Sequence, residues 1–424
     1  MAEYKKKSVK KVKQESDPKP TKITMKSSSD KRPRASKKPV RREFKVIKGR
    51  KDYGKPAPLI LVALAVVLVC AYFIILSINP IGVLETINSY YKKIGSGKGF
   101  DISLKGDNII NVSQQDNTFY ILTETDILCV NSNGKTVSSV SHGFSKPIVK
   151  TSSTRALVYG QGGKHIKIYN YNDIKADLEL ENQILSADIT DNGNFVIASY
   201  AQGYDSVVKV YNKKSEVIFE WYSADGVVSN VTLTPDGKKV YITTFSSSDG
   251  VINSKLSLYN LKSANAEKTV DFKDDLPFGV FVSDKNSVFT VFENKICHYN
   301  FKTGVQTVRE SEYSNTKACF YNKKLAVVSS LSANADKNNI VLLDNKGIVK
   351  NECMVNFNID DFVVFKDSYY ILNVGNIYKT DLSGNVTHSA KVDADIERII
   401  PVSDKIIATV KKYYVTKTEL KENG

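Results

Sequence analysis

The sequence predicts an all-β protein, an eight-bladed β-propeller, preceded by one transmembrane helix and a disordered basic tail. Three observations carry this prediction. A strand-rich unit recurs at intervals of about 42 residues after residue 99, as in propeller repeats. A charge-free apolar run occupies residues 59–78, and the whole net charge of +15 lies N-terminal to that run. The predicted parts are therefore a tail at 1–57, a span at 58–78, a stalk at 79–98 and the propeller at 99–424.

The N-terminal tail carries the charge imbalance of the chain. Residues 1–57 contain 21 Lys and Arg against 6 Asp and Glu, and few branched apolar side chains. Such a segment cannot bury enough surface to offset its chain entropy, so we expect disorder. Its basic clusters, KKKSVKKVK and KRPRASKKPVRR, would be attracted to an anionic membrane leaflet. The alternatives are phosphate contact with nucleic acid and a solvated tail that only sets topology; no specific nucleic-acid partner is predicted.

The apolar run LILVALAVVLVCAYFIILSI spans Leu59 to Ile78 without a charge, Gly or Pro. A helix of this length reaches about 30 Å, the thickness of the hydrocarbon core of a bilayer. Basic residues precede the run and the next one after it is Lys92, which places the N-terminus in the cytoplasm and the rest outside. The run is longer than the apolar region of a signal peptide, and no A-x-A site follows, so an uncleaved signal-anchor is favoured.

The outer region is one unit repeated eight times. Strands ending in Asn or Asp recur as ILCVN, IKIYN, VKVYN, LSLYN, ICHYN, VLLD and IYKTD, and KYYVTK is a weaker eighth copy. Another strand precedes each, and a turn and a further strand follow most of them. Four strands per unit is the pattern of a propeller blade. Seven blades is the second possibility because the last copy is weak. We expect GFDISL at 99–104 to close the ring by completing the last sheet.

One resemblance follows from these motifs. LTPDGKKVYITT at 233–244, followed by LSLYNL, resembles the surface-layer and WD-repeat-like propeller units of bacterial exported proteins. The wider layout resembles an uncharacterised bacterial family of membrane-anchored propellers. That resemblance implies fold and placement only, and it carries no catalytic residues. The Trp-Asp and Gly-His pairs of true WD repeats are absent here.

The sequence shows little sign of catalytic or metal chemistry. The four His and five Cys residues are scattered without metal-ligand spacing, so no metal, cofactor or disulfide framework is predicted. Gly160 to Lys164 resembles a phosphate loop but lacks its spacing and a following helix, which favours a hairpin. The acid pairs Asp274-Asp275 and Asp360-Asp361 fall where one blade passes to the next. Carboxylate pairs of this kind can act as acid and base or hold Ca²⁺, but solvated turns are favoured.

Three connections between the second and third strands of a blade look long: 201–206, 246–254 and 331–339. Binding residues are commonly placed on loops of a rigid scaffold. The candidate contact residues in these loops are Tyr204, Asp205, Asp249, Asn253, Asp336 and Asn338.

The favoured function is a non-enzymatic interaction platform for a protein or a cell-envelope polymer, outside the cell membrane. Two alternatives are left open. The propeller could bind or hydrolyse a glycan or small ligand with acids on its channel face, or act as a sensor that signals through the basic tail.

Overall fold

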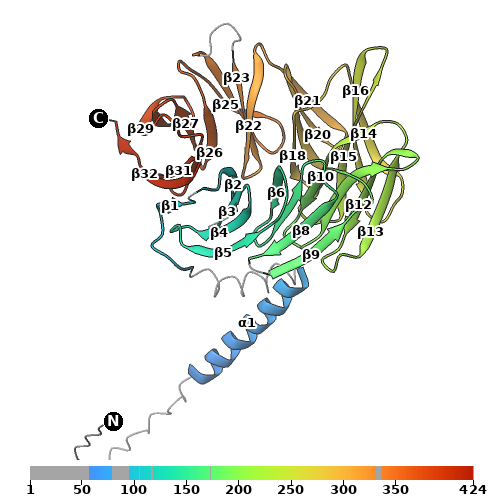
Figure 1. Cartoon of the computed structure of the whole chain (residues 1–424), viewed down its shortest axis with the longest axis horizontal. Coiled ribbons are helices and arrows are strands. Elements are labelled where there is room, and N and C mark those ends of the chain that lie inside the picture. The colour runs from blue at the N-terminus through green and yellow to red at the C-terminus, as the bar shows by residue number, and fades with distance from the viewer. Residues whose placement is uncertain are drawn as a thin grey trace, which may run out of the picture. The chain divides into compact units, whose positions relative to one another are not determined.

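The computed structural model describes the helix at 57–78 and residues 95–423, except for 105, 116–117, 172 and 331–335. Within the helix, side chains are described for residues 62–73. The remainder of the predicted tail and most of the predicted stalk, up to residue 94, lie outside the described residues. In the described part of the chain, one helix is followed only by β-strands and their connections (Figure 1).

The helix α1 (Ala57–Ile78) has 22 residues and coincides with the apolar run. Its sequence contains no acidic residue in the first turn and no basic residue in the last. Several of its described apolar side chains are exposed, including Val67 and Phe73. Among the residues whose placement is described, no helix satisfies both the length and the apolarity required for a membrane crossing.

The strands form eight antiparallel sheets, the blades of a propeller, as predicted. Blades 1 to 4 are β2 (Ile109–Gln115), β3 (Thr118–Thr123), β4 (Asp126–Asn131), β5 (Thr136–Ser141); β6 (Pro147–Thr151), β7 (Ala156–Gly160), β8 (His165–Asn170), β9 (Asp173–Glu179); β10 (Ile184–Ile189), β11 (Phe195–Ala201), β12 (Tyr204–Tyr211), β13 (Val217–Ser223); and β14 (Val227–Leu233), β15 (Lys239–Ser248), β16 (Val251–Asn260), β17 (Ala266–Lys273).

Blades 5 to 8 complete the ring, and two of them recruit a strand from a chain end. They are β18 (Gly279–Asp284), β19 (Ser287–Val291), β20 (Lys295–Asn300), β21 (Val305–Glu310); β22 (Ser314–Tyr321), β23 (Lys324–Ser330), β24 (Asn338–Leu343), β25 (Val349–Val355); β26 (Asp361–Phe365), β27 (Ser368–Asn373), β28 (Asn376–Thr380), β29 (Val386–Lys391), β33 (Lys421–Glu422); and β30 (Arg398–Pro401), β31 (Ile406–Lys411), β32 (Tyr414–Glu419), β1 (Ile102–Ser103).

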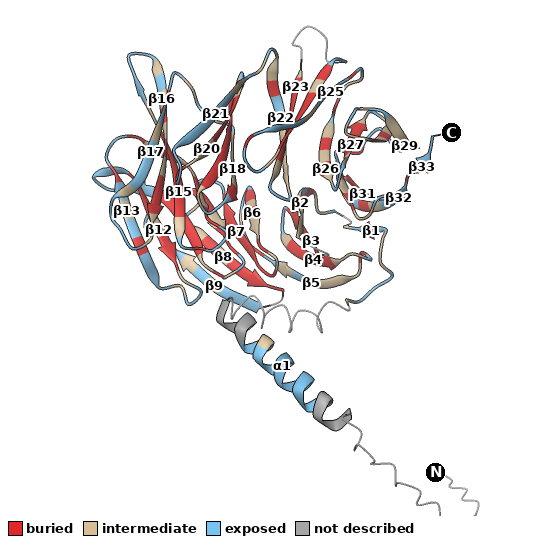
Figure 2. Ribbon diagram, turned by 180° about the vertical axis from the view of Figure 1, so that it is seen from behind, coloured by how far each residue is buried: buried red, intermediate tan, exposed pale blue. Residues whose placement is uncertain are grey.

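Burial follows the order of strands within each blade. The second strands are continuous runs of buried residues, as in β3 and β7, because blades cover both of their faces. The fourth strands are largely exposed, as in β21, where Arg309 is partly buried and the other residues are exposed. Figure 2 shows the same gradient from buried inner strands to exposed outer ones. The β-branched and aromatic residues of the repeat therefore form the core.

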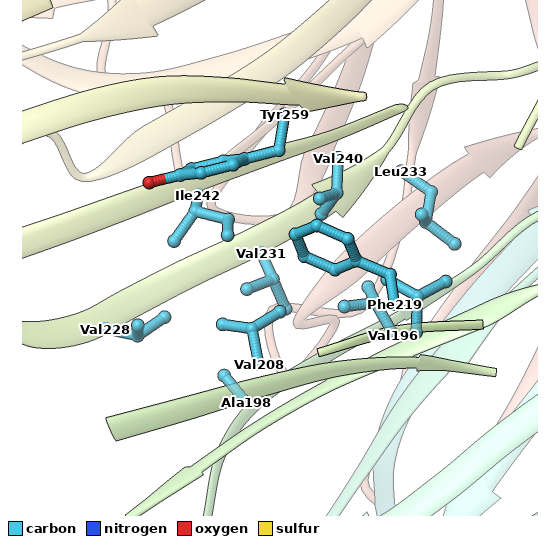
Figure 3. Packing of buried hydrophobic residues seen from close by; sticks show 11 residues of the cluster. Val196, Ala198, Val208, Phe219, Val228, Val231, Leu233, Val240, Ile242 and Tyr259 are labelled. Carbon is cyan, nitrogen blue, oxygen red and sulfur yellow. The ribbon is translucent and has the colours of Figure 1, made fainter. Parts of the chain in front are cut away.

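The apolar core consists of eight clusters, and each cluster joins two consecutive blades. Between blades 3 and 4, Val208 and Phe219 pack against Val231, Val240 and Tyr259 (Figure 3). A single blade cannot bury both of its faces, so each blade depends on its neighbours for a core.

The ring closes through the N-terminal strand, as the sequence predicts. Strand β1 pairs antiparallel with β32, with Ile102 opposite Val415. Ile102 is buried in the cluster that joins blade 8 to blade 1, together with Phe119 and Val410. The weak eighth repeat is therefore a complete blade whose outermost strand comes from the other end of the propeller sequence. The short C-terminal strand β33, which extends blade 7, was not predicted.

Side chains of the innermost strands also bond to the next blade. Ser186 and Asp188 on β10 accept hydrogen bonds from the backbone N–H groups of Val231 and Leu233, at 3.3 and 3.0 Å. Asp361 on β26 accepts one from the N–H of Ile399 at 2.8 Å. These bonds satisfy backbone donors of β14 and β30 that face away from their own sheets.

Because Asp188 is one of these hydrogen-bonding side chains, the stability of the fold depends on pH. Burial raises the pKa of its carboxyl from 3.8 to about 6, although the Leu233 N–H and the charge of Lys150 oppose the rise. The folded state therefore binds more protons than the unfolded state between about pH 4 and 6, and the free energy of unfolding falls as the pH rises through that window.

Asp188→Asn keeps an oxygen that can accept the Leu233 bond but removes the buried charge. We expect it to raise the free energy of unfolding by about 2 kcal/mol at pH 7.5, with the difference shrinking as the pH falls from 6 to 4. Urea titrations of both proteins across this range measure the effect. Equal pH slopes for the two proteins would contradict this account.

Candidate functional site

The connections between strands define two faces of the propeller. The N-terminal face carries the turns that join first to second and third to fourth strands of a blade. The incoming chain contacts this face, because the N–H groups of Ser96 and Phe100 bond to the carbonyls of Thr136 and Asn133. The crossing face carries the hairpins between second and third strands and the segments that pass from blade to blade.

The two faces differ in charge. Among the described residues that connect strands, those of the crossing face include 14 Asp and Glu against 4 Lys, a net of −10. Those of the N-terminal face include 12 Lys and Arg against 7 Asp and Glu, a net of +5. The sequence of this region is nearly neutral overall, so the fold itself separates the charges. The crossing face therefore has a negative potential.

Two of the predicted loops are tight hairpins rather than long loops. Strands β15 and β16 have 10 residues each and stay paired to Ser248 and Val251, so Asp249 and Gly250 alone form the turn. Both have a positive φ, 53° and 79°, as a two-residue hairpin of this twist requires. Strands β11 and β12 likewise pair as far as Ala201 and Tyr204. The polar residues that suggested loops instead lie on the paired arms of these hairpins.

Four of the predicted contact residues lie on these two hairpins of the crossing face. Tyr204 is half exposed, and its ring lies 4.8 Å from that of Tyr222. Asp205 and Asp249 are exposed, and Asn253 is partly exposed on β16. Tyr204, Asp205, Asp249 and Asn253 are thus at the surface, on neighbouring blades 3 and 4.

The two residues predicted in the third loop, in blade 6, have different surroundings. Asp336 is exposed, whereas Asn338 is buried at 1% exposure. The side-chain amide of Asn338 donates to the carbonyl of Phe357 at 2.9 Å and accepts from the hydroxyl of Ser330 at 2.5 Å. Asn338 therefore ties its hairpin to a blade crossing, and contact of its side chain with a partner stays a prediction.

Polar contacts join the hairpins of blades 3 and 4 to the crossings beside them. The carboxylate of Asp205 accepts from the N–H of Gly226 at 2.8 Å, and Lys255 pairs with Asp225 at 2.5 Å. Further along, the N–H of Asp275 donates to the carbonyl of Ile252 at 3.1 Å, and its carboxylate pairs with Lys295 at 2.5 Å. The surface from blade 3 to blade 5 is thus held as one continuous unit.

Apolar and aromatic side chains are exposed along this same unit. Phe278 is 52% exposed and Ile252 is 43% exposed, although both are large and apolar. Trp221, the single tryptophan, packs on Tyr259 and lines a groove of about 370 Å³ between blades 3 and 4. We call the following residues the docking surface: the exposed Tyr200, Tyr204, Tyr222, Ile252, Leu276 and Phe278, together with the partly buried Trp221.

Most of this docking surface was missed by sequence reasoning. Tyr204 was singled out, but Tyr222 and Trp221 lie on an outer strand that reads like any other amphipathic strand of the repeat. The one available signal was the Leu-Pro-Phe sequence at 276–278, in which apolar residues directly follow an acid pair in a connection expected to be solvated. Placing these residues together requires the blades to be adjacent in space.

The groups considered for catalysis have structural contacts. Asp275 and Asp361 are held by Lys295 and by the N–H of Ile399, as described above. Burial raises the pKa of the Cys297 and Cys353 thiols to about 11, which keeps them protonated. His298 is buried against Phe289, and burial lowers its pKa. In the part of the chain that the structure describes, no three His, Cys, Asp or Glu side chains gather as metal ligands would.

The fold defines the class of this protein: it is an eight-bladed β-propeller. The chain belongs to a family of unknown function, DUF5711, whose model matches residues 88–422. No curated protein matches the sequence significantly.

Solved structures with a similar fold have low sequence identity to this chain. BamB from Moraxella catarrhalis is 12% identical with a TM-score of 0.51, and the match covers 77% of this chain and 98% of that one. The C-terminal WD40 domain of Sif2 is also 12% identical, with a TM-score of 0.53 and the same two coverages. A eukaryotic initiation factor is also 12% identical, with a TM-score of 0.51, and the match covers 78% of this chain and 90% of that one. At this identity the likeness concerns the fold alone.

Proposed function

We propose that this protein is a membrane-anchored β-propeller that binds a protein partner outside the cell through its docking surface, without enzymatic activity. The observation that carries the proposal is the group of exposed aromatic and apolar side chains on the crossing face of blades 3 to 5. Tyr and Trp dominate the binding energy of protein interfaces because they bury large areas at a small cost in entropy. Scattered exposed apolar residues are ordinary, but a group beside a groove is typical of interaction sites.

The charge of the crossing face restricts the partner. Asp225, Asp249 and Asp274 lie in the connections that surround the docking surface. A partner that presents Lys or Arg around an apolar centre would complement this surface, and like charges would be repelled. The proposed partner is therefore a protein with a basic rim, in preference to an acidic envelope polymer.

The proposed membrane anchor is the apolar run at 59–78, which lies within α1. It is long enough to cross a bilayer and contains no charge to oppose insertion. The excess of basic residues before it supports a cytoplasmic N-terminus and an extracytoplasmic propeller. In this arrangement the basic tail would contact anionic lipid at the inner leaflet.

Substituting the docking surface tests the proposal. The triple variant Tyr204→Ser, Tyr222→Ser and Ile252→Ser removes three exposed contacts without touching a core cluster. We expect it to reduce recovery of a basic partner protein at least ~10-fold, because one aromatic hot-spot residue contributes about 2 kcal/mol and a tenfold loss corresponds to about 1.4 kcal/mol. Recovery is measured by quantitative mass spectrometry after chemical crosslinking in native membranes and isolation of the full chain.

The matched control removes equally exposed apolar residues near the N-terminal face: Val217→Ser, Val305→Ser and Ile348→Ser, which are 49%, 57% and 55% exposed. It should recover the partner as the unaltered protein does. Equal losses in both triple variants, or no loss in either, would contradict the docking surface. Recovery of an acidic glycan in place of a protein would instead favour the ligand-binding alternative. Loss of function on removing residues 1–45 would favour the sensor alternative.

A further inference from the structure

A lysine-lined cavity opens on the N-terminal face, away from the docking surface. It measures about 800 Å³ and lies where turns of blades 4 and 5 meet. Five lysines line it: Lys238, Lys239, Lys262, Lys285 and Lys302. Asp236 is the one acidic residue in its lining, and Ile218 and Leu261 supply an apolar wall. Five positive charges therefore surround one cavity and need negative groups to neutralise them.

Their immediate surroundings do not supply the balance. Lys239 pairs with Glu267 at 2.6 Å and donates to the side-chain oxygen of Asn286 at 3.0 Å. Among the described residues, Lys238, Lys262, Lys285 and Lys302 have no carboxylate within ion-pair distance. The Asp236 carboxylate is occupied by its own turn, where it accepts from the Thr234 hydroxyl at 2.7 Å and the Lys238 N–H at 3.2 Å. Even with the charges of Asp236 and Glu267 included, the five lysines leave the cavity with a net positive charge.

The turns that carry these lysines are held in place by capping side chains. The side-chain oxygen of Asn260 accepts from the N–H of Lys262 at 3.1 Å, and that of Asn300 accepts from the N–H of Lys302 at 3.0 Å. Asp284 caps the turn of Lys285 by accepting from the N–H of Asn286 at 2.7 Å. The backbone at each lysine is thus fixed, and only the flexible stems remain to be ordered by a ligand.

We propose that this lysine cavity binds an anion that carries two or more phosphate groups. Lysine ammonium groups are compact cations that bind phosphate oxygens, and four without partners match the charge of such a ligand. The volume lies within the range of sites that enclose small ligands. The phosphate can belong to a lipid headgroup, because the incoming chain from the proposed anchor contacts this face, or to a soluble molecule.

The first experiment titrates the full chain, in uncharged detergent, with inorganic tripolyphosphate and follows binding by calorimetry. The variant Lys262→Gln, Lys285→Gln and Lys302→Gln should weaken binding at least ~10-fold. The control Lys213→Gln, Lys214→Gln and Lys346→Gln removes the same charge from exposed turns of the same face, outside the cavity, and should change affinity less than ~3-fold. No saturable binding, or equal weakening by both variants, would overturn the proposal.

The second experiment separates the two sources of phosphate. The full chain is placed in nanodiscs of phosphatidylcholine alone or with cardiolipin, a lipid whose headgroup carries two phosphates, and acetylation of each lysine is measured by mass spectrometry. Protection of Lys262, Lys285 and Lys302 that requires cardiolipin and is reversed by tripolyphosphate assigns the site to a lipid headgroup. Protection by tripolyphosphate alone assigns it to a soluble ligand. Absence of protection under both conditions contradicts the site. Neither result depends on the docking surface.

Discussion

Ile102→Asp is expected to lower the free energy of unfolding by about 3 kcal/mol or more. Ile102 is the one buried residue of β1, and it packs in the cluster between blades 8 and 1. A carboxylate there would leave the closing strand unable to cover that cluster without burying an unpaired charge. Urea titration of the full chain, followed by the fluorescence of Trp221, measures the effect. Trp221 lies between blades 3 and 4, far along the ring from β1. A shift of the unfolding transition seen by Trp221 would therefore show that the stability of the whole ring depends on closure by β1.

The neighbouring residue provides the control. Ser103 is on the same strand but exposed, so Ser103→Asp introduces the same charge without entering the core. It should change the unfolding midpoint little. If Ile102→Asp and Ser103→Asp behaved alike, the short strand would not be closing the ring.

A disulfide between positions 103 and 414 is expected to have the opposite effect. Ser103 lies opposite Tyr414, and the Leu104 N–H bonds to the carbonyl of Tyr413 at 2.9 Å. The 103–414 pair is therefore a non-hydrogen-bonded pair, with Cα atoms about 4.5 Å apart, within the range of disulfides. The double variant Ser103→Cys and Tyr414→Cys would close a loop of roughly 300 residues, which stabilises by about 6 kcal/mol on the chain-entropy model.

The measurement compares the unfolding midpoints of the oxidised and reduced double variant, after mass spectrometry has identified the linked peptides. Each single cysteine variant serves as a control for the substitution itself. Peptides that stay unlinked under oxidising conditions would show that the two ends of the propeller sequence do not meet.

Most of the fold could be predicted because the same pattern of strands recurs in every blade of a propeller. A strand pattern identified in one repeat could be checked against seven further copies. Even closure was visible, since the GFDISL segment had no partner in its own repeat. The C-terminal strand β33 was not predictable, because a two-residue pairing at an outer edge leaves no periodic trace in the sequence.

The candidate site was less predictable, for a physical reason. Polar residues such as Ser246 and Asn253 suggested a loop, but the hairpin pairing of β15 with β16 extends past them to Ser248 and Val251. Asn338 is the first residue of β24 and directly follows an exposed lysine, so in the sequence it looked like part of the loop. The lysine cavity draws on four separate turns. Sites assembled across blades depend on tertiary neighbours that no local pattern records.

Crosslinking in intact cells tests the central claim, that the crossing face of an extracytoplasmic propeller binds a partner. Tyr204→Cys and Phe278→Cys variants are labelled with a membrane-impermeant photoreactive maleimide and illuminated. Of the native thiols, Cys129, Cys297 and Cys353 are buried, but Cys319 is only partly buried and Cys70 on α1 is exposed, so the unaltered protein controls for background. We expect one shared adduct from both positions and none from Val305→Cys near the opposite face. Labelling only after lysis would contradict the membrane topology, and identical adducts from all three positions would contradict the docking surface.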